Sequence, residues 1–378
     1  MEKPERVVAD TSKRGGASLL LALLIVCGCA VASFLPGTTP LRSFSHIIPP
    51  QHVIAEQAKN PILAPESFLS NLTLRAFLAQ DFHLAMAPSF FGFFGYFGLL
   101  SAWDEGMATT TIANNSTTNY LQTNKIQSVA GASAGAMAAM LLAVGISPGK
   151  AAEFCGTIDL PAFADPLGIG SAFKGDKFEQ LMFDFMKEEL STTHSMQMQE
   201  SQIPVAVTAF DLQTFSTLVM TKGCVARASR ASATFPFLFQ PVHWFNGDDD
   251  NDNNDNPKEY LLIDGGILDN HGLVGLSHME PPNKRIVNVV VGKFGGIGTG
   301  VPPGPSQMPE GVVASELLSI SMRNLPQCGP WAMQNGPRAV QAAKEAMMAS
   351  LDLPLYRGTE DGHYELHIDA SSFIPEKE

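Results

Sequence analysis

Ser133 lies in the pentapeptide Gly131-Ala132-Ser133-Ala134-Gly135, after an apolar run at 126–130 and before a helix-forming run at 136–144. A Gly-x-Ser-x-Gly sequence between a strand and a helix presents a serine hydroxyl on a tight turn, where glycines avoid side-chain clashes. We therefore predict that Ser133 is a nucleophile held in an elbow by Gly131 and Gly135. An ordinary strand-to-helix turn uses the same small residues and is the alternative.

An acidic turn follows much later in the chain. The apolar run Leu261-Leu262-Ile263 ends at Asp264-Gly265-Gly266, so a carboxylate stands at the end of a strand on a flexible turn. Such a carboxylate can take a proton from a serine hydroxyl. Turns of this composition also serve purely structural ends.

A third segment combines glycine with aromatic residues. Residues 89–98 read Ser-Phe-Phe-Gly-Phe-Phe-Gly-Tyr-Phe-Gly and precede a helix-like run. Glycines there allow backbone N–H groups to turn towards a developing oxyanion. The alternative is a loop whose aromatic rings fill a core.

Strand-like and helix-like segments alternate along the chain, which favours an α/β fold with a largely parallel sheet. The predicted strands are 126–130, 205–210, 216–221, 260–263 and 286–291. The predicted helices are 99–107, 136–144, 174–189, 312–322 and 338–351.

Composition argues against a polyanionic partner. The 378-residue chain has a formal net charge of −13 and no Lys/Arg cluster, so we expect no nucleic acid to bind. Part of the acidity comes from an Asp/Asn-rich run at 246–257, which predicts a surface loop. The run lacks the alternating ligands and closing Glu of an EF-hand, so we predict no metal site.

The N-terminus predicts a targeting segment at 1–35. Residues 17–35 are uncharged, follow Lys13 and Arg14, and end in small residues, as a secretory signal does. An uncleaved membrane anchor is the competitor. Residues 36–80 read as a linker or transit-like segment. The expected location is the secretory pathway or a membrane, with an algal plastid reached through a two-part leader as the alternative.

Taken together, these blocks resemble the patatin-like phospholipases. Residues 129–135 look like the nucleophile block of that family, and Asp264-Gly265-Gly266 with Asn270 looks like its Asp-Gly-Gly block. The segment 230–242 is similar to a third block between them, and the resemblance covers about 88–292. Two departures stand out: Phe90 replaces the first glycine of the oxyanion loop, and Asn270-His271-Gly272 lacks a proline.

The resemblance implies a three-layer α/β/α catalytic core at 85–295, completed by a helical part at 296–378. It implies a Ser133–Asp264 dyad without a histidine relay, an oxyanion hole at Gly92, Phe93 and Gly95, and no cofactor. The implied substrate is a lipid ester of a membrane or lipid droplet. The resemblance fixes neither the head group nor the oligomeric state. It also implies an acyl-chain slot among the aromatic residues of the glycine-rich segment: Phe90, Phe91, Phe93, Phe94, Tyr96 and Phe97.

Three other functions stay open at this point. An α/β-hydrolase with a Ser–Asp–His triad needs a histidine after Asp264, and the chain offers His271, His278, His363 and His367. A catalytically silent lipid-binding protein would explain the altered glycine loop. A transacylase would use the same acyl-enzyme with an alcohol acceptor.

Overall fold

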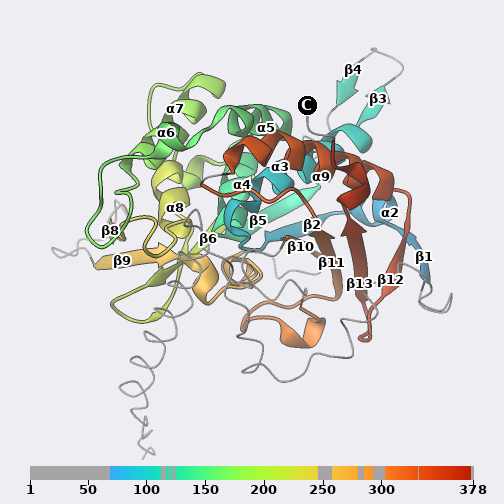
Figure 1. Ribbon diagram of the computed structural model, residues 1–378. Helices are drawn as coiled ribbons and strands as arrows, with labels where there is room; N and C mark the ends of the chain where they lie inside the picture. Colours follow the sequence, from blue (N-terminus) through green and yellow to red (C-terminus); the bar gives the residue numbers. More distant parts are fainter. Residues whose placement is uncertain are drawn as a thin grey trace, which may run out of the picture. The chain divides into compact units, whose positions relative to one another are not determined.

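The computed structural model describes residues 69–111, 116–118, 121, 125–245, 258–279, 285–292, 303–330 and 332–375 (Figure 1). All of them belong to one compact unit, Gln51–Glu378. The expected targeting segment at 1–35 and the Asp/Asn-rich run at 246–257 lie outside the described residues. No helix among the described residues is long and apolar enough to span a bilayer.

The strands are β1 (Leu69–Thr73), β2 (Phe82–Met86), β3 (Thr109–Thr111), β4 (Ser116–Thr118), β5 (Ile126–Ala132), β6 (Val205–Asp211), β7 (Ser216–Met220), β8 (Val242–Phe245), β9 (Glu259–Asp264), β10 (Arg285–Val291), β11 (Glu316–Arg323), β12 (Pro354–Arg357) and β13 (His363–Asp369). The α-helices are α2 (Leu74–Leu78), α3 (Phe93–Gly106), α4 (Ala134–Ala143), α5 (Pro148–Thr157), α6 (Leu160–Phe163), α7 (Asp176–Glu189), α8 (Val225–Ser232) and α9 (Gly336–Ser350).

The central sheet has the strand order β1-β12-β13-β11-β10-β2-β5-β6-β9-β8, and β7 pairs with β6 outside this path. The neighbours from β13 to β6 pair in parallel. The outer strands pair antiparallel. The expected α/β class with a largely parallel sheet is thereby confirmed. The strands β11 and β13 of the C-terminal part lie in this same sheet, and residues 69–78 of the expected linker form β1 and α2.

One edge of β6 brings two distant segments together. Val207 and Thr208 pair with both β5 and β7, whereas Ala209–Asp211 pair with both β9 and β7. A strand has only two edges, so β5 and β9 must share the edge opposite β7. The ends of β5 and β9 therefore meet between Thr208, which pairs with Ala132, and Ala209, which pairs with Asp264.

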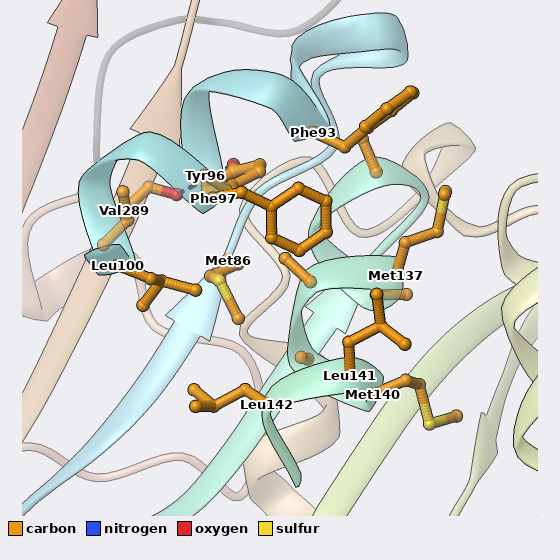
Figure 2. Packing of buried hydrophobic residues seen from close by; sticks show 14 of the residues in the cluster. Met86, Phe93, Tyr96, Phe97, Leu100, Met137, Met140, Leu141, Leu142 and Val289 are labelled. Atoms are coloured by element: carbon orange, nitrogen blue, oxygen red, sulfur yellow. Dashed lines mark hydrogen bonds between the residues drawn. The ribbon is translucent and has the colours of Figure 1, made fainter. Parts of the chain in front are cut away.

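The domain has the three-layer α/β/α arrangement. The longer helices cover one face of the sheet. Helix α3 packs against α4, α5 and α9, and these helices lie together beside the strands in Figure 1. Figure 2 shows Phe97 and Leu100 of α3 facing Met86 and the α4 side chain Leu142. The opposite face is covered by shorter elements. Segments that contain the 3-10 helices Val274–His278 and Pro305–Gln307 pack against it.

The hydroxyl group of Tyr96 fixes α3 to the sheet. It donates to the carbonyl oxygens of Ala87 at 2.6 Å and Val289 at 3.2 Å, just after β2 and within β10. The Tyr96 side chain is fully buried, so both bonds are made away from water, where an unpaired hydroxyl would be costly. These contacts set where α3 begins relative to the carboxyl ends of the strands.

The five predicted strands and four of the five predicted helices are confirmed. The exception is 312–322, which was expected to be helical but contains the parallel strand β11 between β10 and β13. Its apolar residues are buried on both faces of the sheet, and such a strand reads as a continuous apolar run that periodicity cannot separate from a helix. Helix α3 begins at Phe93 rather than 99, so half of the glycine-rich segment is helical.

Candidate active site

Ser133 occupies a strained position between β5 and α4. Its backbone has φ 54° and ψ −123°, a conformation that residues with a Cβ rarely adopt. The two glycines around it permit close packing. A Cβ on Gly131 would lie 2.6 Å from the Gly135 carbonyl group, and one on Gly135 would lie 2.1 Å from the Met86 oxygen. Ser133 is 5% exposed and lines a pocket.

Asp264 ends β9 on the same side of the sheet. Its Oδ2 accepts a hydrogen bond of 2.7 Å from Ser133 Oγ, and its Oδ1 accepts one of 2.8 Å from Gly266 N–H. Gly265 allows the turn to pass close to β6, since a Cβ there would lie 2.1 Å from the Thr208 oxygen. The structure thus brings together the two side chains that the sequence nominated.

Burial changes the acidity of Asp264. The carboxyl group is 6% exposed, and loss of hydration raises its pKa to about 6 from an ordinary value of 3.8, against the lowering effect of hydrogen bonds from Ser133 and Gly266. A carboxylate with this pKa is a stronger base than an ordinary one and is still mostly ionised at neutral pH. It can therefore accept a proton from a neighbouring hydroxyl group.

Ser232 holds the elbow from behind, a role that the sequence did not reveal. Its Oγ accepts a hydrogen bond from Ser133 N–H at 2.9 Å and donates to the Thr208 carbonyl oxygen at 2.7 Å. Ser232 thereby links the nucleophile turn to β6 with its single hydroxyl group. The only signal in the sequence was its place in the small-residue segment 230–242.

Asp269 is a second buried acid that sequence reasoning missed. It accepts hydrogen bonds from Thr208 Oγ1 at 3.0 Å and from the backbone N–H groups of Leu273 at 3.1 Å and Val274 at 3.3 Å. Burial raises its pKa to about 6 as well. These bonds fasten the segment after the Asp-Gly-Gly turn to β6.

The pocket beside Ser133 and Asp264 is almost wholly apolar. Besides the dyad and Cys155, its lining consists of apolar side chains from several elements: Phe90, Phe91, Phe93, Met137, Leu141, Phe154, Ile158, Phe163, Phe178, Leu181, Met182, Ala233, Phe235, Leu238, Phe239 and Met333. Figure 2 shows Phe93 and Met137 on the same side of the contact between α3 and α4. A lining of this kind suits a hydrocarbon chain and leaves the two polar groups to select what reacts.

Only part of the aromatic segment lines this pocket. Phe90, Phe91 and Phe93 do, and their role as an acyl slot stays a prediction. Phe94 and Phe97 are instead buried in the core, and Tyr96 bonds to the sheet. The helical turn from Phe93 onward separates the two groups, because it directs successive side chains to different faces.

Both members of the dyad lie within a match to a known protein family. Residues 92–276, which include both Ser133 and Asp264, match the family model described as patatin-like phospholipase. These residues form a patatin-like phospholipase domain. The solved structure of VipD from Legionella pneumophila is also similar, with a TM-score of 0.39 and 14% identity over 71% of this chain and 53% of VipD. The chain thus spans about half of the length of VipD.

The patatin-like domain supports a lipid acyl hydrolase, and it directs attention to the donors for an oxyanion in this chain. Gly92 N–H already donates to the Ser89 oxygen at 2.8 Å. Phe93 and Gly95 lie in the first turn of α3, where backbone N–H groups have no acceptor within the helix. A Cβ on Gly95 would contact Val291 and Leu325, so its Cα faces the sheet. The assignment of these three donors stays a prediction.

Phe90 keeps a backbone conformation that suits glycine. Its φ is 52°, in the left-handed region, at the position where the patatin-like family carries the first glycine of its loop. The Phe90 ring packs against Phe91 and Phe235 with centroid distances of 4.7 and 4.8 Å. The backbone at Phe90 therefore keeps the conformation that a glycine would adopt, and the Phe90 side chain adds an aromatic ring to the pocket lining.

The positions of the histidines bear on the triad alternative. None lines the pocket formed by the described residues. His363 and His367 lie on β13, four strands from β5, which corresponds to about 19 Å. His363 Nε2 is bonded with Ser319 Oγ at 3.0 Å. His278 Nδ1 is 3.0 Å from Ser277 Oγ, and the backbone oxygen of His271 accepts from Asn288. These positions weigh against a triad.

Proposed function

We propose that this protein hydrolyses carboxylic esters of lipids through an acyl-enzyme on Ser133, with Asp264 as the only side-chain base. The observation that carries the proposal is the 2.7 Å hydrogen bond from Ser133 Oγ to Asp264 Oδ2 at the wall of an apolar pocket. A hydroxyl group bonded to a buried carboxylate is prepared for proton transfer as it attacks.

The reaction follows from these positions. Ser133 Oγ attacks the ester carbonyl carbon while its proton passes to Asp264. Collapse of the tetrahedral intermediate breaks the bond to the alcohol, which takes the proton from Asp264 as it leaves. Water then attacks the acyl carbon and gives a proton to Asp264. The bond between that carbon and Ser133 Oγ breaks as Asp264 returns the proton to Oγ, and the fatty acid departs. Backbone N–H groups at the start of α3, and that of Ala134 at the start of α4, are the proposed oxyanion donors.

The pocket supports a lipid over a small polar ester. Its apolar lining includes Phe163 of α6, Phe154 of α5 and Met182 of α7. Burying an acyl chain there contributes about 0.8 kcal/mol for each methylene group. Chain length should therefore govern the affinity more than the head group does.

The test uses the full chain and a mixed extract of membrane lipids. We expect the wild-type protein to release free fatty acids, measured by mass spectrometry. Ser133→Ala and Asp264→Asn should each lower the rate by at least about a thousandfold. A fluorophosphonate probe should label the wild-type protein at Ser133 alone. Folded wild-type protein that releases no fatty acid but binds lipid would favour a silent lipid-binding protein. Transfer of the acyl group to an added alcohol instead of water would favour a transacylase.

We also propose that residues 1–35 direct the chain into the secretory pathway or to a membrane. The uncharged stretch 17–35 supports this proposal. Fusion of residues 1–65 to a fluorescent protein tests it by microscopy. Reticular or membrane fluorescence agrees with the proposal, plastid fluorescence supports the two-part leader, and diffuse fluorescence contradicts both.

A further inference from the structure

Two exposed aliphatic side chains stand at the tip of the loop between α6 and α7. Leu167 is 79% exposed and Ile169 is 86% exposed, far more than most large apolar residues of the described chain. Gly168 lies between them, and Gly170 follows Ile169. Two such side chains held in water side by side have no role in folding the core, so they indicate a surface that something apolar covers.

A neighbouring loop adds an aromatic ring to this surface. Phe237 is 37% exposed, and its carbonyl oxygen accepts a hydrogen bond from Ala172 N–H at 2.8 Å. Ile169 N–H donates to Gln240 Oε1 at 3.1 Å, which joins the two loops a second time. We call Leu167, Ile169 and Phe237 the apolar tip.

The base of the α6–α7 loop is fixed by hydrogen bonds. Asp165 accepts from the N–H groups of Gly175 at 3.0 Å and Lys177 at 3.1 Å, which closes the loop on itself. The buried Arg230 donates to the Lys174 oxygen at 2.7 Å and also pairs with Asp176. The apolar tip is therefore presented by an anchored loop, which lowers the entropy cost of docking.

The two segments that carry the apolar tip adjoin residues that line the pocket. Phe163, before the α6–α7 loop, lines the pocket that contains Ser133, and so do Leu238 and Phe239, directly after Phe237. Phe173 packs on Phe163 and Phe239, with ring centroids 6.2 and 6.1 Å away. The apolar tip thus lies close in the chain to residues that line the pocket, on both segments.

The charges around the tip indicate which kind of membrane surface it can contact. Neither 166–173 nor 231–242 contains a charged residue. The chain as a whole has a net charge of −13, which disfavours approach to an anionic surface. A zwitterionic bilayer offers an apolar interior without that repulsion, and aliphatic and aromatic side chains enter its interface readily.

We propose that the apolar tip docks this protein on the surface of a lipid bilayer, so that an acyl chain can pass from the membrane along the two loops to Ser133. The proposal deepens the proposed function and rests on it for the destination of the acyl chain. Docking itself depends only on the tip, so it persists when Ser133 cannot react.

The first test measures insertion at single positions in the full chain carrying Ser133→Ala. Ile169→Trp reports on the tip, and Leu353→Trp is the control, because Leu353 is 49% exposed and lies just before β12. With phosphatidylcholine vesicles brominated in their acyl chains, we expect the added fluorescence at 169 to shift to the blue and to be quenched, in low and high salt alike. The added fluorescence at 353 should not change.

Equal quenching at both positions, or quenching at neither, overturns the proposal. The first result would mean non-specific adsorption, and the second would mean that any attachment comes from elsewhere, including residues 17–35. A blue shift at 169 that grows with protein concentration without vesicles would mean that a second copy covers the tip, which also overturns it.

The second test removes the tip. In the Ser133→Ala chain, Leu167→Ser with Ile169→Ser should weaken vesicle partitioning on the order of 100-fold. The matched control replaces Val313, which is 67% exposed, and Leu353 with serine and should leave partitioning unchanged. With Ser133 intact, the tip variant should lower the ratio of vesicle turnover to soluble short-chain ester turnover by tenfold or more. An unchanged ratio overturns the proposal, whereas a wild-type protein that inserts its tip but hydrolyses neither substrate overturns only the proposed function.

Discussion

The hydroxyl group of Ser232 accepts a hydrogen bond of 2.9 Å from the backbone N–H of Ser133. The same hydroxyl group donates to the Thr208 carbonyl oxygen, so one side chain pairs the buried N–H of Ser133 and the buried oxygen of Thr208. Ser232→Ala would leave a buried donor and a buried acceptor without partners. We expect it to lower the free energy of unfolding by about 1–3 kcal/mol and to lower kcat through displacement of Ser133.

Ser229 provides the matched control for that variant. It lies on the same helix, is equally buried, and its Oγ has no hydrogen-bond partner in the described structure. Ser229→Ala should therefore change stability by less than about 1 kcal/mol and leave kcat unaltered. Denaturant unfolding and ester turnover measure both. Equal effects of the two variants would contradict the role given to Ser232.

The pH dependence of turnover should report on Asp264. Its pKa is raised to about 6 by burial, and only the ionised carboxylate can take the Ser133 proton. We therefore expect kcat/KM to rise with pH through a midpoint near 6 and then to level off. Asp269→Asn should keep this midpoint, although the pKa of Asp269 is also about 6, because Asp269 does not contact Ser133. If the midpoint near pH 6 disappeared in Asp269→Asn, the titration seen in kcat/KM would belong to Asp269 and not to Asp264.

The same burial has a cost in stability. The folded pKa of Asp264 is about 6 and its ordinary value is 3.8, so between these pH values the folded state keeps a proton that the unfolded state has released. The contribution of protonated Asp264 is present in full below pH 4 and is lost as pH rises through 6. The Asp264→Asn variant should not lose this contribution. Its free energy of unfolding, relative to that of the wild type, should therefore rise by on the order of 3 kcal/mol from pH 4 to pH 8. Chemical unfolding at both pH values measures the difference. A pH-independent difference would contradict the raised pKa.

Phe90 offers a test of backbone strain separate from side-chain packing. Its positive φ of 52° costs a residue with a Cβ about 1 kcal/mol, a cost that glycine avoids. Phe90→Ala and Phe90→Gly both remove the ring, so their difference isolates the backbone. Phe90→Gly should be more stable than Phe90→Ala by about 1 kcal/mol in thermal or chemical unfolding. If alanine is the more stable, the loop does not hold this conformation in solution.

Replacement of single histidines separates the dyad from a triad. His363 is buried and bonded with Ser319 on strands remote from Ser133. His363→Gln should therefore lower stability and leave the turnover of folded protein within about twofold of wild type. Asparagine or glutamine at His271, His278 or His367 should likewise preserve turnover. Loss of turnover by a thousandfold in any one folded variant would require a third catalytic residue.

Ser133 and Asp264 could be singled out from the sequence because each stands at the end of a strand-like run on a recognisable turn, and turns are local. That the two form a dyad was implied only by the family resemblance. It does not predict β11, because Leu317, Leu318 and Ile320 are buried on both faces and carry no period that distinguishes strand from helix. Ser232 and Asp269 escape notice for another reason. Their roles depend on hydrogen bonds to Thr208, which lies 24 and 61 residues away and comes near only when the sheet forms.

The shared edge of β6 has a consequence for which parts of this chain can vary. The meeting of Ser133 and Asp264 is encoded in the pairing of Ala132 with Thr208 and of Asp264 with Ala209. The stretch from α5 to α7, which supplies several residues of the pocket lining, lies in the chain between Ala132 and Thr208. Insertions, deletions and substitutions in that stretch therefore need not disturb either pairing, so the pocket can change in size while Ser133 and Asp264 stay together.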